Sequence, residues 1–158
     1  METNQARDDR SAHAGDEPHA GPGIARSGRN PGMAGSGLDR SSEIVSHAGV
    51  AYFVATPPKP YDAAASAAEQ MRGALEKVDA RLARVGATRA DLLMVQIWLR
   101  DMRYFREINE VWDGWIDQDA MPVRCCCACE MGSPDMKLEL IVTCRAPRTG
   151  ASARSSAG

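Results

Sequence analysis

The hydrophobic positions after residue 42 first form short runs that are typical of β-strands. Two such runs, 43–46 and 50–56, are rich in β-branched and aromatic residues and lie on either side of Gly49. This arrangement predicts a β-hairpin whose turn uses the ability of glycine to adopt a positive φ. The prolines within 57–60 end the second strand, because proline has no N–H to donate to a strand ladder.

From residue 62 to residue 85 the apolar positions instead recur every three or four residues. This period predicts an amphipathic helix with Asp62 as its N-cap and Gly86 at the position that stops it. The charged residues between the apolar ones are expected to meet solvent. The predicted buried stripe comprises Ala64, Ala67, Ala68, Met71, Leu75, Val78, Leu82 and Val85.

The second half of the pattern predicts three more strands and one more helix. Residues 92–99 are almost continuously apolar, which is typical of a strand covered on both faces. Asp101 can cap the second helix. Two further strands are predicted at 122–131 and 137–144, with a turn between them at 132–135. The buried stripe of the second helix comprises Met102, Phe105, Ile108, Trp112 and Trp115.

The resulting order, β-β-α-β-α-β-β, predicts a two-layer α+β domain over residues 39–147. One sheet is expected to be covered by the two helices on one face. The opposite face of the sheet must then meet solvent, a ligand or another subunit.

The chain has 158 residues, and its composition is uneven along its length. Residues 1–38 hold half of the 14 glycines and show no apolar period, which predicts a disordered tail. Residues 148–158 are expected to form a flexible C-terminal tail. Met33 is a second candidate for the start of translation.

Charge and hydropathy exclude some classes of partner. The formal net charge of -2 gives no electrostatic reason to expect nucleic acid or an anionic membrane. No apolar run reaches the roughly 18 residues that a membrane span needs, and the N-terminal region has no apolar secretory core. We therefore expect a cytoplasmic protein.

Four of the five cysteines lie within residues 125–129. In a reducing compartment they are expected to be thiols. A metal site is not expected, because alternate side chains of a strand point to opposite faces and the cluster cannot converge on one ion.

The parity of the last two strands predicts which residues share a face of the sheet. The apolar alternate residues of 138–142 are expected to face the helices, and the small odd-numbered cysteines of 125–129 suit the same layer. Arg124 and Glu139 are therefore predicted to lie together on the uncovered face. The face toward the helices would hold Cys125, Cys127, Cys129, Leu138, Leu140 and Val142.

An arginine and a glutamate on paired strands suit a site for a small anionic substrate such as a keto or imino acid. A guanidinium group binds a carboxylate with two parallel hydrogen bonds, and a second carboxylate nearby accepts a proton or orients water. The same two residues could instead only hold a contact between subunits, because salt-bridge networks are common.

These residues also carry a resemblance to a known family. The segment 121–140, with Pro122-Val-Arg124-Cys and Lys137-Leu-Glu139, resembles the signature of the Rid/YjgF family of reactive-intermediate (enamine/imine) deaminases. The helix segment Asn109-Glu-Val-Trp-Asp-Gly-Trp adds to the likeness, which is strongest to the YoaB-like branch. The resemblance covers about residues 40–146.

The resemblance implies a chorismate-mutase-like fold and a homotrimer with sheets inward and ligand sites in the clefts between subunits. Arg124 would bind the substrate carboxylate and Glu139 would activate water, while Cys126 and Asn109 would line the substrate site. The implied reaction converts a 2-enamine or 2-imine acid, such as 2-aminoacrylate, into a 2-keto acid and ammonia. It requires no cofactor and no metal.

The chain departs from the family pattern in two places. The best-characterised deaminase branch has a Gly-Pro-Tyr motif near the first strand, where residues 40–43 here read Arg-Ser-Ser-Glu. That branch also has Ser-Gly at the end of the second strand, where this chain has Val54-Ala55. A second hypothesis is therefore a trimeric protein that binds small carboxylates without turnover. A third, thiol chemistry at Cys126, requires a lowered thiol pKa.

Overall fold

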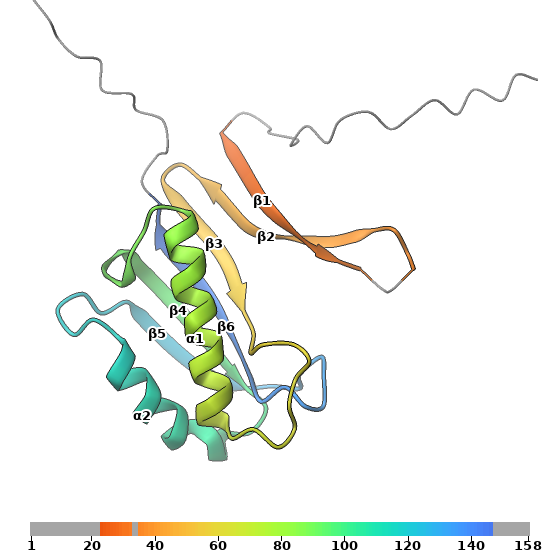
Figure 1. The fold of residues 1–158 in the computed structure, drawn as a ribbon. Helices are drawn as coiled ribbons and strands as arrows, with labels where there is room; N and C mark the ends of the chain where they lie inside the picture. Colours follow the sequence, from red (N-terminus) through yellow and green to blue (C-terminus); the bar gives the residue numbers. More distant parts are fainter. Residues whose placement is uncertain (1–22, 33–34, 147–158) are drawn as a thin grey trace, which may run out of the picture.

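A computed structural model describes residues 23–32 and 35–146 as two layers, a six-stranded sheet and two helices (Figure 1). The strand order is β1-β2-β3-β6-β4-β5, in which β4 and β5 are parallel and the other neighbours are antiparallel. The predicted α+β class is confirmed. The elements are β1 (Ile24–Pro31), β2 (Asp39–His47), β3 (Val50–Ala55), α1 (Ala67–Arg84), a 3₁₀ turn (Arg89–Asp91), β4 (Leu92–Leu99), a second 3₁₀ turn (Met102–Tyr104), α2 (Phe105–Trp115), β5 (Val123–Ala128) and β6 (Leu138–Arg145).

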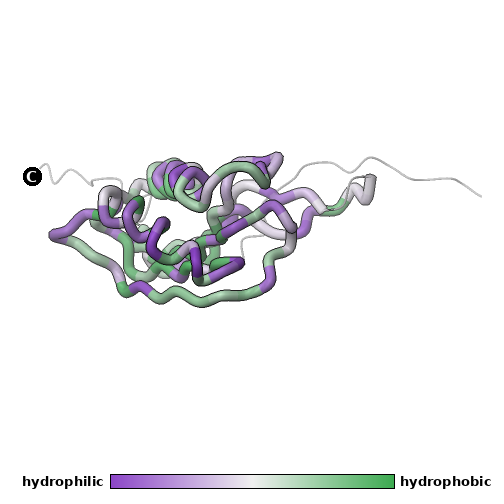
Figure 2. The backbone as a smooth tube through the Cα atoms, turned by 90° about the horizontal axis from the view of Figure 1, so that it is seen from below, coloured by the Kyte–Doolittle hydropathy of each residue, from purple (hydrophilic) through white to green (hydrophobic). Residues whose placement is uncertain are grey.

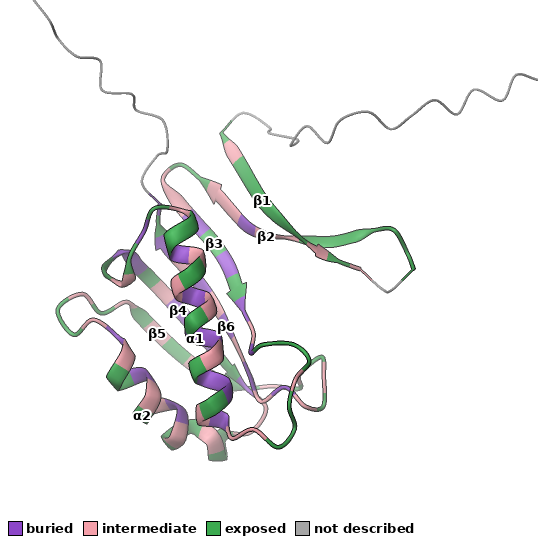
Figure 3. Ribbon diagram, in the orientation of Figure 1, coloured by how far each residue is buried: buried purple, intermediate pink, exposed green. Residues whose placement is uncertain are grey.

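Strand β1 lies inside the segment that the sequence predicted to be a disordered tail, so that prediction is wrong for residues 24–31. The strand is largely exposed and pairs with β2 at one edge of the sheet (Figure 3). It is held by backbone pairing rather than by burial, and the apolar pattern therefore did not reveal it. The predicted tail segments 1–22 and 148–158 lie outside the described residues. So does Met33, and a chain that began there would lack β1.

The hairpin of β2 and β3 follows the sequence prediction. His47 pairs with Val50 across a two-residue turn, in which Ala48 has φ 50° and Gly49 has φ 81°. Two positive φ values are characteristic of the type I′ turn, whose twist matches that of the two strands.

Helix α1 begins four residues later than predicted. Ser66, not Asp62, is the N-cap: its hydroxyl accepts a hydrogen bond from the Glu69 N–H, and the Glu69 carboxylate accepts one from the Ser66 N–H at 2.7 Å. This reciprocal capping box satisfies two backbone donors at once. The helix ends as predicted, with Gly86 at φ +68° and its N–H donating to the Ala83 carbonyl.

The core lies between the helices and one face of the sheet. Val95, Ile97 and Leu99 of β4 are buried there, whereas Trp98 points to the other face and is 37% exposed. Strand β4 is therefore covered on one face within the chain, not on both as its apolar run predicted. The buried residues of β6 that share this core are Leu138, Leu140, Val142 and Cys144.

The sheet face opposite the helices is open and apolar. Tyr52, Val54 and Val123 expose their side chains on it, as Trp98 does. In Figure 2 the strands beneath the helices carry long hydrophobic stretches. Neither helix of the described chain is long and apolar enough to cross a membrane.

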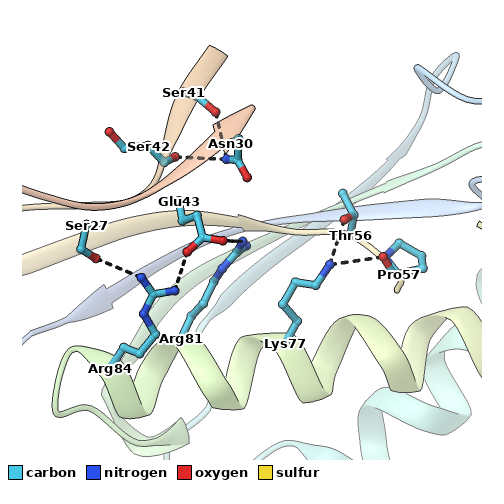
Figure 4. Close-up of polar contacts among 10 residues, drawn as sticks. All are labelled: Ser27, Asn30, Ser41, Ser42, Glu43, Thr56, Pro57, Lys77, Arg81 and Arg84. Carbon is cyan, nitrogen blue, oxygen red and sulfur yellow. Dashed lines mark hydrogen bonds and ion pairs between the residues drawn. The ribbon is translucent and has the colours of Figure 1, made fainter. Parts of the chain in front are cut away.

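An ion-pair cluster anchors the hairpin of β1 and β2 to α1 (Figure 4). Glu43 of β2 accepts a hydrogen bond from Arg84 Nη1 at 2.6 Å, and Arg81 Nη2 lies 3.8 Å from its other carboxylate oxygen. Arg84 also donates to Ser27 Oγ of β1 at 3.4 Å. The hydrogen bond from Arg84 lowers the pKa of Glu43, which keeps this carboxylate charged at neutral pH.

Replacing Glu43→Gln is expected to loosen the hairpin by up to about 1 kcal/mol, the range of partly exposed ion pairs. Because the native pKa of Glu43 is lowered, its contribution is present above the pKa of the unfolded chain and is lost as the pH falls through the native value. Hydrogen exchange of the β1 amides at neutral and acidic pH measures the effect. Asp39→Asn, which breaks the exposed Arg29–Asp39 pair of the same hairpin, is the matched control. Equal exchange in Glu43→Gln and wild type would contradict the anchoring role.

Candidate functional site

Arg124 lies on β5, at the edge of the sheet, and points toward the helices. In the parallel ladder with β4 it pairs with Val95, and Cys126 pairs with Ile97. Both partners are core residues, so Arg124 and Cys126 belong to the face that α2 covers. The prediction that Arg124 lies on the uncovered face is wrong.

The cysteines of β5 also lie on the face of the sheet opposite to the predicted one. Cys125 and Cys127 pair with Gln96 and Trp98 and are exposed on the uncovered face. Their small size suited either layer, and the prediction placed them by analogy with the leucines of β6. The register of β5 against the buried Val95 and Ile97 decides the orientation, and the aromatic rings of helix α2 cover the Arg124 side chain on that face.

Three residues of α2 surround the guanidinium group of Arg124. Asn109 Oδ1 accepts a hydrogen bond from Arg124 Nη2 at 2.7 Å. The guanidinium carbon lies 5.0 Å from the ring centroid of Trp112 and 6.0 Å from that of Phe105. Residues 105, 109 and 112 are spaced by four and then three positions, which places them on one face of a helix. Of these contacts, the resemblance implied only Asn109 as a site residue.

The positive charge of Arg124 has no anionic partner within the described part of the chain. No described carboxylate lies within ion-pairing distance of its guanidinium, and its Nε is buried without a hydrogen-bond partner. Burial lowers the pKa of Arg124, although nearby Cys126, Asp113 and Cys125 oppose the shift. A half-buried, unneutralised guanidinium group is an attractive site for a carboxylate.

Cys126 lies beside Arg124 and packs against the core. Burial raises the pKa of its thiol, and the opposing effect of the Arg124 charge is smaller. The hypothesis of thiol chemistry required a lowered pKa, so the structure argues against it. Cys126 is instead a partly buried residue that packs against the core.

Glu139 of β6 lies on the uncovered face of the sheet. It is opposite Trp98 of β4, which is in turn opposite Cys127 of β5. Its carboxylate makes no hydrogen bond or ion pair with any described residue, and it is half-buried. Burial raises the pKa of Glu139. A carboxylate with a raised pKa binds a proton more tightly than an ordinary glutamate does, which suits it to act as a base.

A single copy of the chain does not bring Arg124 and Glu139 together. The two side chains project from opposite faces of the sheet, and β4 lies between their strands, which separates the backbones by about 10 Å. The sequence placed them on one face, and this expectation is wrong because the register of β5 against β4 is fixed by the buried residues of β4. The described residues also contain no group of three or more His, Cys, Asp or Glu side chains arranged to hold a metal ion.

The aromatic residues that enclose Arg124 had no predicted site role. Phe105 and Trp112 were predicted as members of the buried stripe of the second helix. Trp112 is buried, but Phe105 is 38% exposed. Their spacing relative to Asn109 was a usable signal, because a polar residue within an aromatic stripe marks a possible contact with a charged group.

Comparison with known proteins agrees with the fold. The family model described as Endoribonuclease L-PSP matches residues 42–145. A RutC family protein of Haemophilus influenzae is 32% identical over 103 residues, which is 65% of this chain and 88% of that protein. The chain belongs to the Rid/YjgF family.

The other relatives support this membership. The RutC family protein YoaB of Escherichia coli is 31% identical over 101 residues, 64% of this chain and 86% of that protein. The crystal structure of a YjgF family member from Neisseria meningitidis superposes with a TM-score of 0.66 and 30% identity, covering 77% of this chain and 93% of that one. The resemblance found in the Arg124 and Glu139 segments is therefore confirmed as a family relationship.

Cys126 is expected to react with iodoacetamide at pH 7 more slowly than a free model thiol. The reason is that burial raises its pKa and restricts access to the sulfur. Peptide mapping after timed alkylation gives the rate, with the protein in denaturant as the reference for an unhindered Cys126. A rate above that of the model thiol would restore the hypothesis of a reactive cysteine.

Proposed function

We propose that this protein hydrolyses reactive 2-enamine and 2-imine acids to 2-keto acids and ammonia, as a homotrimer without metal or cofactor. The observation that carries the proposal is the half-buried guanidinium group of Arg124, which has no anionic partner among the described residues. The substrate carboxylate supplies the missing negative charge, and two hydrogen bonds from one guanidinium group fix its orientation.

Glu139 is the general base of the proposed reaction. The enamine first tautomerises to the imine by moving a proton to its terminal carbon. Water then adds to the imine carbon while Glu139 takes one of its protons and passes it to the imine nitrogen, which gives a carbon bearing one hydroxyl and one amino group. Glu139 next takes the hydroxyl proton and delivers it to the amino nitrogen, so that the C–N bond breaks, ammonia leaves and the oxygen becomes the keto oxygen. The raised pKa of Glu139 suits both transfers.

The trimer is part of this proposal because Arg124 and Glu139 lie on opposite faces of one sheet. We place Arg124 of one subunit opposite Glu139 of the partner subunit, across a cleft between them. The open apolar face that holds Glu139, Tyr52 and Trp98 favours contact with another copy of the chain. A site at this boundary contains both groups, whereas a single chain cannot bring them together.

A second candidate function is the binding of small carboxylates without turnover. The region that holds the cleft tyrosine in the deaminase branch is occupied here by polar residues of β2 that contact β1. Asn30 Nδ2 donates to Ser41 Oγ at 3.0 Å and to the Ser42 carbonyl at 3.4 Å (Figure 4). These residues supply no aromatic group. Release of ammonia from an imine generated in solution distinguishes the two functions.

Replacing Arg124→Ala is expected to raise KM, or the Kd for pyruvate, by roughly 30- to 100-fold, because charge-assisted hydrogen bonds are lost. Arg124→Lys keeps the charge but not the planar fork and is expected to recover part of the affinity. Steady-state kinetics with 2-aminoacrylate generated in situ, and calorimetry with pyruvate, provide the measurements. Unchanged KM and Kd in Arg124→Ala would refute its assignment as the carboxylate anchor.

Replacing Glu139→Gln is expected to lower kcat by roughly 10²- to 10⁴-fold, the usual contribution of a general base. In the wild type, kcat should rise with pH through the raised pKa of Glu139, because the base must be deprotonated.

The stability of Glu139→Gln should be retained or increased, although its kcat falls. A raised native pKa means that the folded chain holds this proton more tightly, so stability falls as the pH rises above the unfolded value. At pH 7 Glu139→Gln should therefore unfold in urea no earlier than wild type, and its lower kcat cannot come from unfolding. A variant with wild-type kcat would exclude Glu139 as the base.

A further inference from the structure

We propose that the neutrality of the Asn109 side chain is a specificity device: it orients Arg124 by a hydrogen bond while leaving the arginine charge free for the carboxylate of the ligand. This inference rests on the proposed function and deepens it, because it names what makes the guanidinium group selective for an incoming anion. Asn109 is thereby a positioning residue.

A second arginine of the same chain, Arg89, has its charge neutralised by a carboxylate and serves as a comparison. Arg89 lies 4.7 Å from the ring centroid of Trp115, much as Arg124 lies 5.0 Å from that of Trp112. Its Nε and Nη2 donate to the two carboxylate oxygens of Asp79 at 2.9 and 2.7 Å. Each arginine therefore has a tryptophan ring as one partner. The other partner differs: it is a carboxylate for Arg89 and an amide for Arg124.

The rest of the Arg89 cluster completes its hydrogen bonding. Arg89 Nη1 donates to the Trp115 carbonyl at 2.6 Å, and Trp115 Nε1 donates to Asp79 at 3.0 Å. The bonds to Asp79 raise the pKa of Arg89, whereas burial lowers that of Arg124. The Arg89 cluster joins α1 to the end of α2 and has no charge left for a ligand.

The Arg124 cluster differs from the Arg89 cluster because it contains an amide in place of a carboxylate, so that the charge of Arg124 is left for the ligand. Asparagine and aspartate side chains have nearly the same shape. Either side chain at position 109 could accept the hydrogen bond from Arg124 Nη2, which is 2.7 Å long. An aspartate there would neutralise Arg124 permanently and would compete with the ligand carboxylate for the same donors. The ring faces of Trp112 and Phe105 attract the cation without supplying a negative charge. They therefore hold the guanidinium group in place and leave it free to pair with an anion.

The test compares pyruvate affinity and thermal stability in Asn109→Asp, Asn109→Ser and wild type. Asn109→Asp is expected to weaken pyruvate binding at least about tenfold, and more than Asn109→Ser does, because only the aspartate neutralises the arginine. Its Tm should stay at or above the wild-type value, since a half-buried cation gains an anionic partner. Loss of binding together with retained stability cannot be explained by a merely structural role for Asn109.

Asp79→Asn provides the reciprocal control, because it removes the carboxylate of the Arg89 cluster. It is expected to lower Tm and to leave the pyruvate Kd unchanged. Pyruvate binding by Asn109→Asp equal to that of wild type would overturn this inference and leave the proposed function standing. A wild-type protein that neither binds pyruvate nor releases ammonia would overturn the proposed function, and this inference with it.

Discussion

The charge of Arg124 is the constraint on which the rest of the site depends. A guanidinium group that leaves water must recover hydration energy from its surroundings. In this chain Asn109, Trp112 and Phe105 supply part of it through one hydrogen bond and two ring faces. None of these groups is negative, so the site is most stable when an anion completes it. The packing of α2 over the edge strand β5 thus leaves a cation without an anionic partner, and the proposed function uses this cation to bind a carboxylate.

The sheet separates the two groups that the proposed reaction uses. One face is packed against the helices and holds the anchor, and the other face is open and holds Glu139 among apolar side chains. Closing that face with another copy of the chain would bury apolar surface and bring a base to each anchor at the same step. In the proposed trimer, stability and activity therefore have the same structural origin.

The sequence allowed the order of most elements to be predicted, because periodicity and capping residues are local signals. Gly49 and Gly86 marked a turn and a helix end correctly. β1 was missed because its stability comes from pairing with β2, which leaves no apolar pattern. The predicted orientation of Arg124 was wrong because alternation along one strand shows which residues share a face, but not which of the two faces is packed against the helices. Only the register of β5 against Val95 and Ile97, a tertiary property, decides it.

The central claim is that Arg124 and Glu139 act across a subunit boundary, and subunit mixing tests it most directly. At substrate concentrations below the wild-type KM, Arg124→Ala and Glu139→Gln as pure proteins should each keep at most a few per cent of wild-type activity under this account. When the two variants are unfolded together and refolded in equal amounts, about one quarter of the clefts should receive Arg124 from one subunit and Glu139 from the partner subunit. The account predicts that ammonia release returns to about that fraction of wild type. No recovery in mixed oligomers of verified composition would contradict it.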